Sequence, residues 1–369
     1  MTEGMSVAHT RVVSVEQPCR GFRRIVLAGA DLEHASADLL GLLPPGVPDL
    51  HQLYHGSRPR RDAYVKVLIP PPGGVSADPD LSAGFRSGFL AIPEAERGWM
   101  RTYTVRSAGR VRLDGRAVPS LTLDVVLHGD PDDPDDPHQG PGLRWARTVS
   151  AGDEVNVLVP GAEAPAWTGW RDTGARRILA VGDETAVPAL LSVAEELADP
   201  FGGFSGEADL ILELPAEAGL TDLIAERLAV PEPWDWTRPL AVAEHGRVRL
   251  HVGRRGVADG TGDRPAGADL PQGSWAHGRL AALLGLGGED RGEGAVVVPE
   301  VPPAEGEHRE WTIAEIDPVS GTERPDAYVF LAGESAMVRG LRRLCVGDGG
   351  IPKSHVSFMG YWRHGQAES

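Results

Sequence analysis

The sequence predicts two halves of different architecture, a β-barrel or β-sandwich followed by an α/β domain with a parallel sheet. Up to about residue 160, short strand-like segments are separated by turn residues and no long helical period occurs, as is typical of all-β folds. After residue 175, apolar strands alternate with segments of helical spacing, which is the pattern of βα units. We therefore expect one domain over residues 1–170 and a second over residues 171–369.

In the first half, β-branched and aromatic residues bounded by Gly and Pro mark the strands. We expect them at 12–27 (one or two strands, interrupted near Pro18 and Gly21), 63–69, 101–106, 121–128 and 154–159. Residues 32–42 have a short helical spacing that ends before Pro44. Segments 70–86 and 93–99 are expected to be loops, the first from its Pro and Gly content.

In the second half, the continuous apolar run 177–181 predicts a strand that is buried on both faces. The elements expected after it are a turn at 182–186, a helix at 187–197, a strand at 209–214, a helix at 220–228, strands at 248–252 and 327–331, and a helix at 335–344. Segments 256–274 and 286–308 are rich in Gly, Asp, Glu and Pro, so we expect surface insertions there.

The composition is that of a globular protein, with 41% hydrophobic and 24% charged residues. The formal net charge of -17 disfavours nucleic acid and anionic membranes as partners. No apolar run is long enough to span a bilayer and no signal-peptide pattern begins the sequence, so we expect a cytoplasmic protein. Cys19 and Cys345 have no metal-like spacing and are expected to be free thiols.

The segment from Arg101 to Arg106 carries an arginine, a tyrosine and threonines in an extended stretch. Side chains at alternate positions of a strand point the same way, so Arg101 and Tyr103 are expected to face together. A guanidinium can grip a pyrophosphate, a tyrosine ring can lie on a flat heterocycle, and a threonine can hydrogen-bond to its edge. The set suits a flavin dinucleotide; the alternative is a plain β-strand with a polar outer side.

The turn from Gly182 to Ala186 follows a buried strand and precedes a helix, which is the position at which open parallel sheets bind ligands. Its backbone amides and the helix N-terminus suit a phosphate, and Thr185 suits a nicotinamide or a ribose. The alternative is that Asp183 or Thr185 caps the helix. A Gly-x-Gly-x-x-Gly fingerprint is absent from the sequence.

Three further segments carry residues suited to binding. Residues 140–146 either wrap a phosphate with the amides of a short helix start or form a turn with a packed tryptophan. The aromatic and basic residues 357–365 either cover a flat cofactor or anchor the end of the chain in a groove of the core. The acidic stretch 130–138 is expected to be a solvated insertion, because its spacing does not match a calcium-binding loop.

Together these motifs resemble the siderophore-interacting proteins, which are flavin-containing ferric-siderophore reductases built like ferredoxin-NADP reductase. The resemblance is carried, in chain order, by residues 63–69, 101–106, 126–129, 140–146, 182–189, 332–343 and 356–365. It implies an N-terminal antiparallel six-stranded β-barrel that holds FAD and a C-terminal α/β domain that receives NADH or NADPH. It also implies hydride transfer from nicotinamide to flavin, then single-electron transfer to an anionic ferric siderophore, which releases Fe(II) in the cytoplasm.

The resemblance also implies roles for individual residues. Tyr103, Thr104 and Thr185 take the catalytic positions, and Arg101 neutralises the FAD pyrophosphate. The other residues assigned to FAD or the nicotinamide nucleotide are Val105, His128, Gly129, Gly142, Leu143, Trp145, Ala146, Gly182, Asp183, Glu184, Gly333, Glu334 and Trp362. Our candidates for a basic pocket around the siderophore, or else for solvated surface positions, are Lys66, Arg144, Arg147 and Arg363. No metal site is expected.

The sequence departs from the family's pattern at Gly142 and Leu143, where Ala-Ser is common, so a hydroxyl able to contact the flavin phosphates is missing. The stretch 130–138 and the insertions 35–60, 256–274 and 286–308 lengthen loops, which leaves the identity of the siderophore open. Arg254 and Arg255 either read the 2'-phosphate of NADPH or are solvated. We expect a monomer. Two alternatives remain: a ferredoxin-dependent reductase of the same family, and a siderophore or flavin carrier without turnover.

Overall fold

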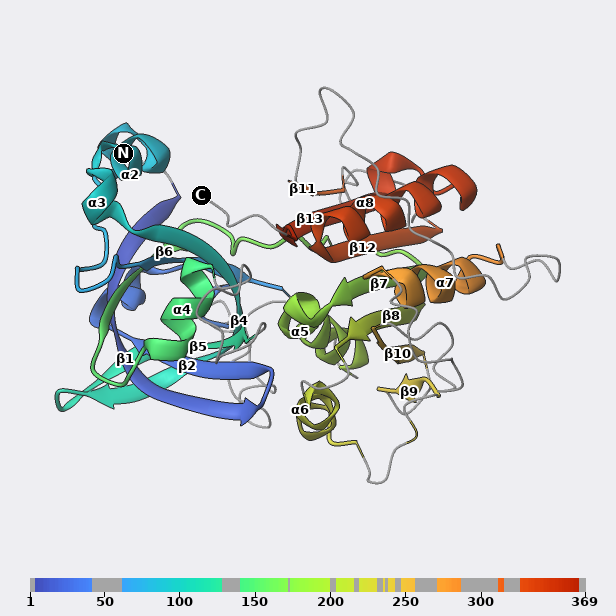
Figure 1. The fold of residues 1–369 in the computed structure, drawn as a ribbon, viewed down its shortest axis with the longest axis horizontal. Coiled ribbons are helices and arrows are strands. Elements are labelled where there is room, and N and C mark those ends of the chain that lie inside the picture. The colour runs from blue at the N-terminus through green and yellow to red at the C-terminus, as the bar shows by residue number, and fades with distance from the viewer. Residues whose placement is uncertain are drawn as a thin grey trace. The chain divides into compact units, whose positions relative to one another are not determined.

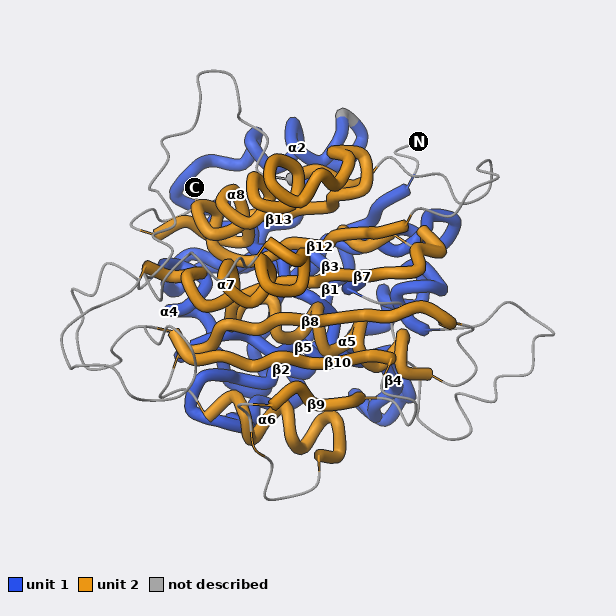
Figure 2. Tube along the Cα trace, turned by 90° about the vertical axis from the view of Figure 1, so that its right-hand side faces the viewer, with its two compact units in different colours: residues 1–168, 367–369 blue, residues 169–366 orange. Residues whose placement is uncertain are grey.

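The computed structural model describes residues 4–41, 62–127, 140–171, 173–199, 204–215, 219–230, 235, 238–242, 247–255, 271–286, 311–314 and 326–364. The chain divides into two compact units, residues 1–168 with 367–369 (unit 1) and residues 169–366 (unit 2), shown in two colours in Figure 2. No helix among the described residues is long and apolar enough to cross a membrane.

Unit 1 is a closed barrel of six strands. They are β1 (Met5–Cys19), β2 (Phe22–Ala28), β3 (Tyr64–Ile69), β4 (Trp99–Leu113), β5 (Arg116–Val126) and β6 (Glu154–Pro160). Their order is β1-β2-β5-β4-β3-β6, and all neighbouring pairs are antiparallel (Figure 1). Alternate residues such as Ile25, Val67, Leu123 and Val157 form the buried core. The predicted antiparallel six-stranded barrel is confirmed.

Helix α4 (Pro141–Thr148) packs against this core through Trp145 and Ala146, whereas Arg144 is exposed. Pro141 suits the first turn because its missing N–H would have no partner within the helix. The C-terminal end is held by Arg23, whose Nη2 donates to the carbonyl oxygen of Val149 at 3.3 Å. The helix start of the first interpretation is observed, and so is the packed tryptophan of the second.

The helix predicted over residues 32–42 is wrong. Over the described residues up to 41, the structure has the 3-10 helix η1 (Ala30–His34), followed by a bridge at Ala35 and a turn, in place of an α-helix. The next residue, Ala35, bridges to Gly161, and Ser36 N donates to the carbonyl oxygen of Pro160 at 2.8 Å. This pairing with the end of β6 draws the backbone out of a helical course.

The expected loops between β3 and β4 are also wrong in part. They contain η2 (Leu81–Ala83), α2 (Phe85–Ala91) and α3 (Glu94–Arg97). In α3, the carbonyl oxygen of Pro93 accepts from the amides of Glu96 and Arg97, both at 2.9 Å, so a proline that suggested a loop instead begins a helical turn. The strand predicted at 101–106 is the first half of the longer β4, which pairs with β5 through Leu113 and Arg116.

Unit 2 contains one seven-stranded sheet of order β11-β13-β12-β7-β8-β10-β9. Its strands are β7 (Arg177–Asp183), β8 (Glu207–Leu214), β9 (Leu240–Ala241), β10 (Val248–Arg254), β11 (Trp311–Thr312), β12 (Ala327–Glu334) and β13 (Val356–Trp362). The strands from β13 to β10 run parallel, and among the described strands the short edge strands β9 and β11 are antiparallel to their neighbours. The predicted α/β domain with a parallel sheet is confirmed.

The chain order fixes where this sheet can bind a ligand. From β7 the chain adds β8 and β10 on one side, then returns to add β12 and β13 on the other side. Ligands of such sheets bind at the carboxyl ends of the strands, where the order reverses, which here is between β7 and β12.

The described helical elements of unit 2 are η3 (Glu184–Ala186), α5 (Val187–Ala198), α6 (Leu220–Arg227), α7 (Ser274–Leu283), α8 (Ser335–Arg343), the π-helical η4 (Leu344–Asp348) and η5 (Lys353–His355).

Several elements of unit 2 are absent from the prediction, and two of them, α7 and β13, bear on the site. Helix α7 begins at Ser274, the last residue of the segment expected to be a surface insertion. The aromatic residues 357–362, for which we considered a cover or an anchor in a groove, belong to β13, which pairs with β12 along its length. The tail is therefore part of the sheet.

Candidate functional site

Arg101 and Tyr103 lie on the same side of β4. In the ladder with β3 they are opposite Val67 and Val65, whose side chains belong to the barrel core, so the alternation of β4 turns both toward α4. The ring of Tyr103 stacks on that of Trp145, with centroids 6.2 Å apart and planes inclined by 30°. The motif and the helix thus form one surface.

Gly142, in the first turn of α4, is where these side chains meet. A Cβ at this position would lie 2.9 Å from Tyr103 Oη and 3.3 Å from Arg101 Cγ, so a larger residue would displace them. The N-cap residue is Gly140, which has no side chain to cap the helix. Because an α-helix leaves its first amides without intrahelical partners, the N–H groups of Gly142 and Leu143 stand beside a guanidinium, a combination that binds anions.

The other face of β3 and β4 carries Lys66, Thr102 and Thr104. Lys66 Nζ donates to Thr102 Oγ1 at 3.1 Å and lies 5.9 Å from the centroid of the Tyr64 ring. Thr104 is opposite Tyr64 in the ladder. The structure therefore separates the side chains of Thr104 and Lys66 from those of Arg101 and Tyr103.

The remaining predicted residues of unit 1 that the structure describes lie on β4 and α4. Val105, Trp145 and Ala146 are in the barrel core, and Leu143 is buried. Arg144 is exposed on α4, and Arg147 is partly buried. His128, Gly129 and the acidic stretch 130–138 lie outside the described residues.

Asp183 is the centre of the carboxyl edge of the sheet in unit 2, and its side chain is fully buried. Its Oδ1 accepts hydrogen bonds from the amide and the hydroxyl of Thr185. Its Oδ2 accepts from Glu334 N at 2.8 Å, Gln272 Nε2 at 2.9 Å and Trp362 Nε1 at 3.0 Å. Asp183 thus caps η3, and its carboxylate joins four separate segments of the edge.

The turn between β12 and α8 is shaped to fit this carboxylate. Gly333 has φ +136°, and a Cβ there would lie 2.7 Å from Asp183 Cγ, so only glycine fits. Glu334 caps α8 by accepting from two of its first amides, at 2.6 and 2.8 Å. At Gly182, a Cβ would lie 2.4 Å from that of Ala186. Each of these predicted nucleotide-site residues therefore has a structural part in building the edge.

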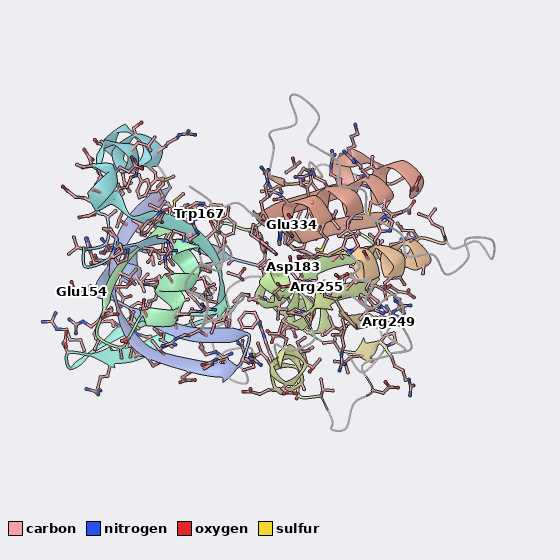
Figure 3. The ribbon with its side chains drawn as sticks, in the orientation of Figure 1. Glu154, Trp167, Asp183, Arg249, Arg255 and Glu334 are labelled. Atoms are coloured by element: carbon pink, nitrogen blue, oxygen red, sulfur yellow. The ribbon has the colours of Figure 1, made fainter. Side chains whose placement is uncertain are left out.

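Glu184 follows Asp183, is buried, and forms an ion pair with Arg255. Asp183, Arg255 and Glu334 are found at the same end of the sheet in Figure 3. Burial, together with the neighbouring Asp183 carboxylate, raises the pKa of Glu184 to about 7, while Arg255 acts in the opposite direction. Arg254 is exposed. Of the two arginines predicted to read a phosphate, Arg255 is therefore paired with Glu184 and Arg254 faces solvent.

The end of β13 carries the last predicted residues. Trp362 is half-buried, and the hydrogen bond from its indole N–H to Asp183 fixes the ring at the carboxyl edge. Arg363 follows it and belongs to unit 2, whereas Lys66, Arg144 and Arg147 belong to unit 1.

Sequence reasoning missed three residues at this edge, Glu213, Gln272 and Trp275. Glu213 is buried at the end of β8, and Gln272 and Trp275 flank the start of α7. An acidic residue within the apolar run 210–214 was an available signal for Glu213, because buried charges need dedicated partners. Gln272 and Trp275 adjoin a Gly- and Asp-rich stretch that gave no such signal.

Two family models match the chain. The model described as a siderophore-interacting FAD-binding domain matches residues 46–164, and the one described as a siderophore-interacting protein matches residues 292–365. The chain belongs to the siderophore-interacting FAD-binding family. The family suggested by the ordered motifs is therefore confirmed, and with it FAD as a cofactor.

Solved structures of the same fold include a siderophore utilization protein from T. fusca, which is 20% identical. That match covers 99% of this chain and 96% of the other, with a TM-score of 0.51. The siderophore-interacting protein SipS from Aeromonas hydrophila is 18% identical over 99% of this chain and 100% of its own, with a TM-score of 0.48.

The geometry of unit 1 fits the FAD that this family binds. Gly142 leaves open the space that a Cβ would fill between Arg101 and Tyr103, and the start of α4 presents amides to the same place. The donor set suits a pyrophosphate, and the ring of Tyr103 suits a flat heterocycle.

Proposed function

We propose that this protein is an FAD-dependent reductase that takes electrons from NADH or NADPH and passes them to a ferric siderophore. The observation that carries the proposal is the meeting of Arg101, Tyr103 and the uncapped start of α4 at Gly142, in a chain of the siderophore-interacting FAD-binding family. Bound FAD supplies the conversion of a two-electron donor into one-electron steps.

The residues of unit 1 would bind and orient this cofactor. Arg101 would neutralise the pyrophosphate together with the amides of Gly142 and Leu143. Tyr103, held by its stacking on Trp145, would cover one face of the isoalloxazine. Thr104, whose side chain points to the other face of β4, would act through its backbone.

The carboxyl edge of unit 2 would receive the pyridine nucleotide, since it lies at the point where the strand order reverses. Thr185 would lie near the nicotinamide. The rigid turn built by Asp183 and Gly333 would leave room for the nucleotide to reach the strand ends. Arg254 would face the 2'-phosphate of NADPH, because Arg255 is already paired with Glu184.

This division of roles between the two arginines is testable by single substitutions. In Arg254→Ala we expect the ratio of NADPH to NADH efficiency (kcat/KM) to fall about tenfold, since a hydrogen bond to a charged group contributes about 1.5–3 kcal/mol. Arg255→Ala is the matched control and should change both donors alike through Glu184. Equal ratios in the wild type and Arg254→Ala would remove Arg254 from phosphate recognition.

Basic residues would attract the anionic ferric chelate; the candidates are Lys66, Arg144 and Arg147 in unit 1 and, considered by itself, Arg363 in unit 2. Reduction to Fe(II) weakens binding by hard oxygen ligands, so the metal would leave without a protein metal site.

The proposal is tested by capturing Fe(II) with ferrozine from a ferric catecholate or a ferric hydroxamate under anaerobic conditions. We expect capture to require the FAD-loaded protein and NADH or NADPH, and to be lost in Arg101→Ala. Capture only with reduced ferredoxin would favour the ferredoxin-dependent alternative. FAD retention without any Fe(II) release would favour a carrier.

A further inference from the structure

Trp275, the second residue of α7, is seated directly on the backbone of β10. A Cβ at Gly253 would lie 2.0–2.2 Å from three atoms of the indole, Cδ2, Cε2 and Cε3. The ring therefore covers the Cα of Gly253 face-on, and only glycine allows this approach. The next residue of β10 is the exposed Arg254, one position nearer the carboxyl end of the strand.

The backbone on both sides of Trp275 is fixed by one buried acid, Glu213. Glu213 accepts from Gly273 N at 2.7 Å and from Ala276 N at 3.0 Å. Gln272, just before them, donates to Asp183. Burial raises the pKa of Glu213, so a carboxylate is held in an unfavourable place with its oxygens aimed at the start of α7.

Glycine at position 273 adds a third constraint. It has φ +88°, and a Cβ there would lie 2.4 Å from Met337 Cγ, so α7 begins in tight contact with α8. Trp275 nevertheless remains partly exposed while its other side packs on the apolar cluster of the sheet. The protein thus presents a preorganised aromatic surface at the carboxyl edge, and preorganisation lowers the entropic cost of stacking a ligand on it.

We propose that Trp275 stacks on the adenine ring of the pyridine nucleotide, with Arg254 beside the phosphate of the same nucleoside. The inference rests on the proposed function, in which this edge receives the nucleotide. Strand β10 lies two strands from β7, which is about 10 Å along the edge. The nicotinamide half at the β7 turn and the adenosine half at β10 therefore occupy different strand ends.

The test is calorimetric binding of two nucleotide fragments to the full-length, FAD-loaded protein. ADP-ribose carries the adenosine half without nicotinamide, and nicotinamide mononucleotide carries the other half without adenine. In Trp275→Leu, which keeps apolar volume but removes the aromatic face, we expect ADP-ribose to bind roughly 5- to 150-fold more weakly. Nicotinamide mononucleotide should bind as to the wild type, and Trp275→Phe should retain most of the ADP-ribose affinity.

Trp275→Phe is the matched control, because it keeps an aromatic face at the same position. Wild-type affinity for ADP-ribose in Trp275→Leu would overturn the proposal. Equal losses for both fragments, with a lowered melting temperature, would also overturn it, since the indole would then only support the fold. If ADP-ribose fails to bind the wild type, the proposed use of a pyridine nucleotide fails as well. Failure of the proposed function is thereby distinguished from failure of the Trp275 assignment alone.

Discussion

Adding a single methyl group at Gly142 is expected to weaken FAD binding without unfolding the protein. In Gly142→Ala the new Cβ would lie 2.9 Å from Tyr103 Oη and 3.3 Å from Arg101 Cγ. To regain ordinary contact, the tyrosine hydroxyl has to move by about 0.5 Å, yet its ring is stacked on Trp145. Arg101 is also tethered, since its Nη1 donates to the carbonyl oxygen of Met100 at 2.8 Å.

The expected magnitude follows from the bonds at risk. Displacing a guanidinium from a phosphate costs about 1.5–3 kcal/mol, which corresponds to roughly 10- to 150-fold weaker FAD binding. Alanine is about 1 kcal/mol better than glycine within a helix, and crowding of the side chains costs about 1–3 kcal/mol, so stability should fall by no more than about 2 kcal/mol.

The assay is titration of FAD into the cofactor-free protein, followed by quenching of flavin fluorescence. Gly140→Ala is the matched control, because a Cβ there meets nothing within 4 Å in the described part of the chain; its FAD affinity should stay within about twofold of the wild type. Unchanged affinity in Gly142→Ala, or equal losses in both variants, would refute the reasoning.

Three further predictions concern unit 2. Because the pKa of Glu184 is raised from 4.5 to about 7 in the folded protein, its stabilising protonation is complete below pH 4.5 and lost as the pH rises through 7. Relative to Glu184→Gln, the wild type should lose about 3 kcal/mol between these limits in urea unfolding, and parallel pH profiles would contradict this. The side chain of Arg227 is 2% exposed and is paired with Glu195 at 2.7 Å. Arg227→Met should therefore lower the free energy of unfolding by about 3–5 kcal/mol, whereas a decrease below about 1 kcal/mol would show that the pair is dispensable. Gly333→Ala should destabilise by at least about 2 kcal/mol through its positive φ and the contact with Asp183. Gly347→Ala, whose Cβ would meet none of the described residues within 4 Å, should change the melting temperature little.

The parts of the fold that the sequence predicted were those with a strong local period. The apolar run 177–181 and the turn after it gave β7 and η3, and the alternation from 101 to 106 correctly turned Arg101 and Tyr103 to one side. The extension of β4 beyond residue 106 was missed because residues 107–112 are largely small or charged, and it is the pairing with β5 that keeps them extended.

The interior of the candidate site was less predictable, because its bonds join segments distant in sequence. Asp183 was expected either to bind a nucleotide or to cap a helix, and its bonds to Gln272 and Trp362 cross 89 and 179 positions of sequence. Likewise, nothing in the sequence around Gly253 indicates that the ring of Trp275 covers it, and the contact is evident only in the structure. Such contacts depend on strand order, which local patterns do not contain.

The most direct test of the proposed reductase is the visible spectrum of the purified protein under anaerobic conditions, before and after NADPH or NADH and then a ferric siderophore. We expect flavin absorbance that bleaches on addition of the nucleotide and returns on addition of the chelate. A flavin spectrum that neither nucleotide changes would contradict the nicotinamide-dependent role and favour ferredoxin as donor. If no flavin binds, even after reconstitution with FAD, then Arg101, Tyr103 and Gly142 do not form the cofactor site.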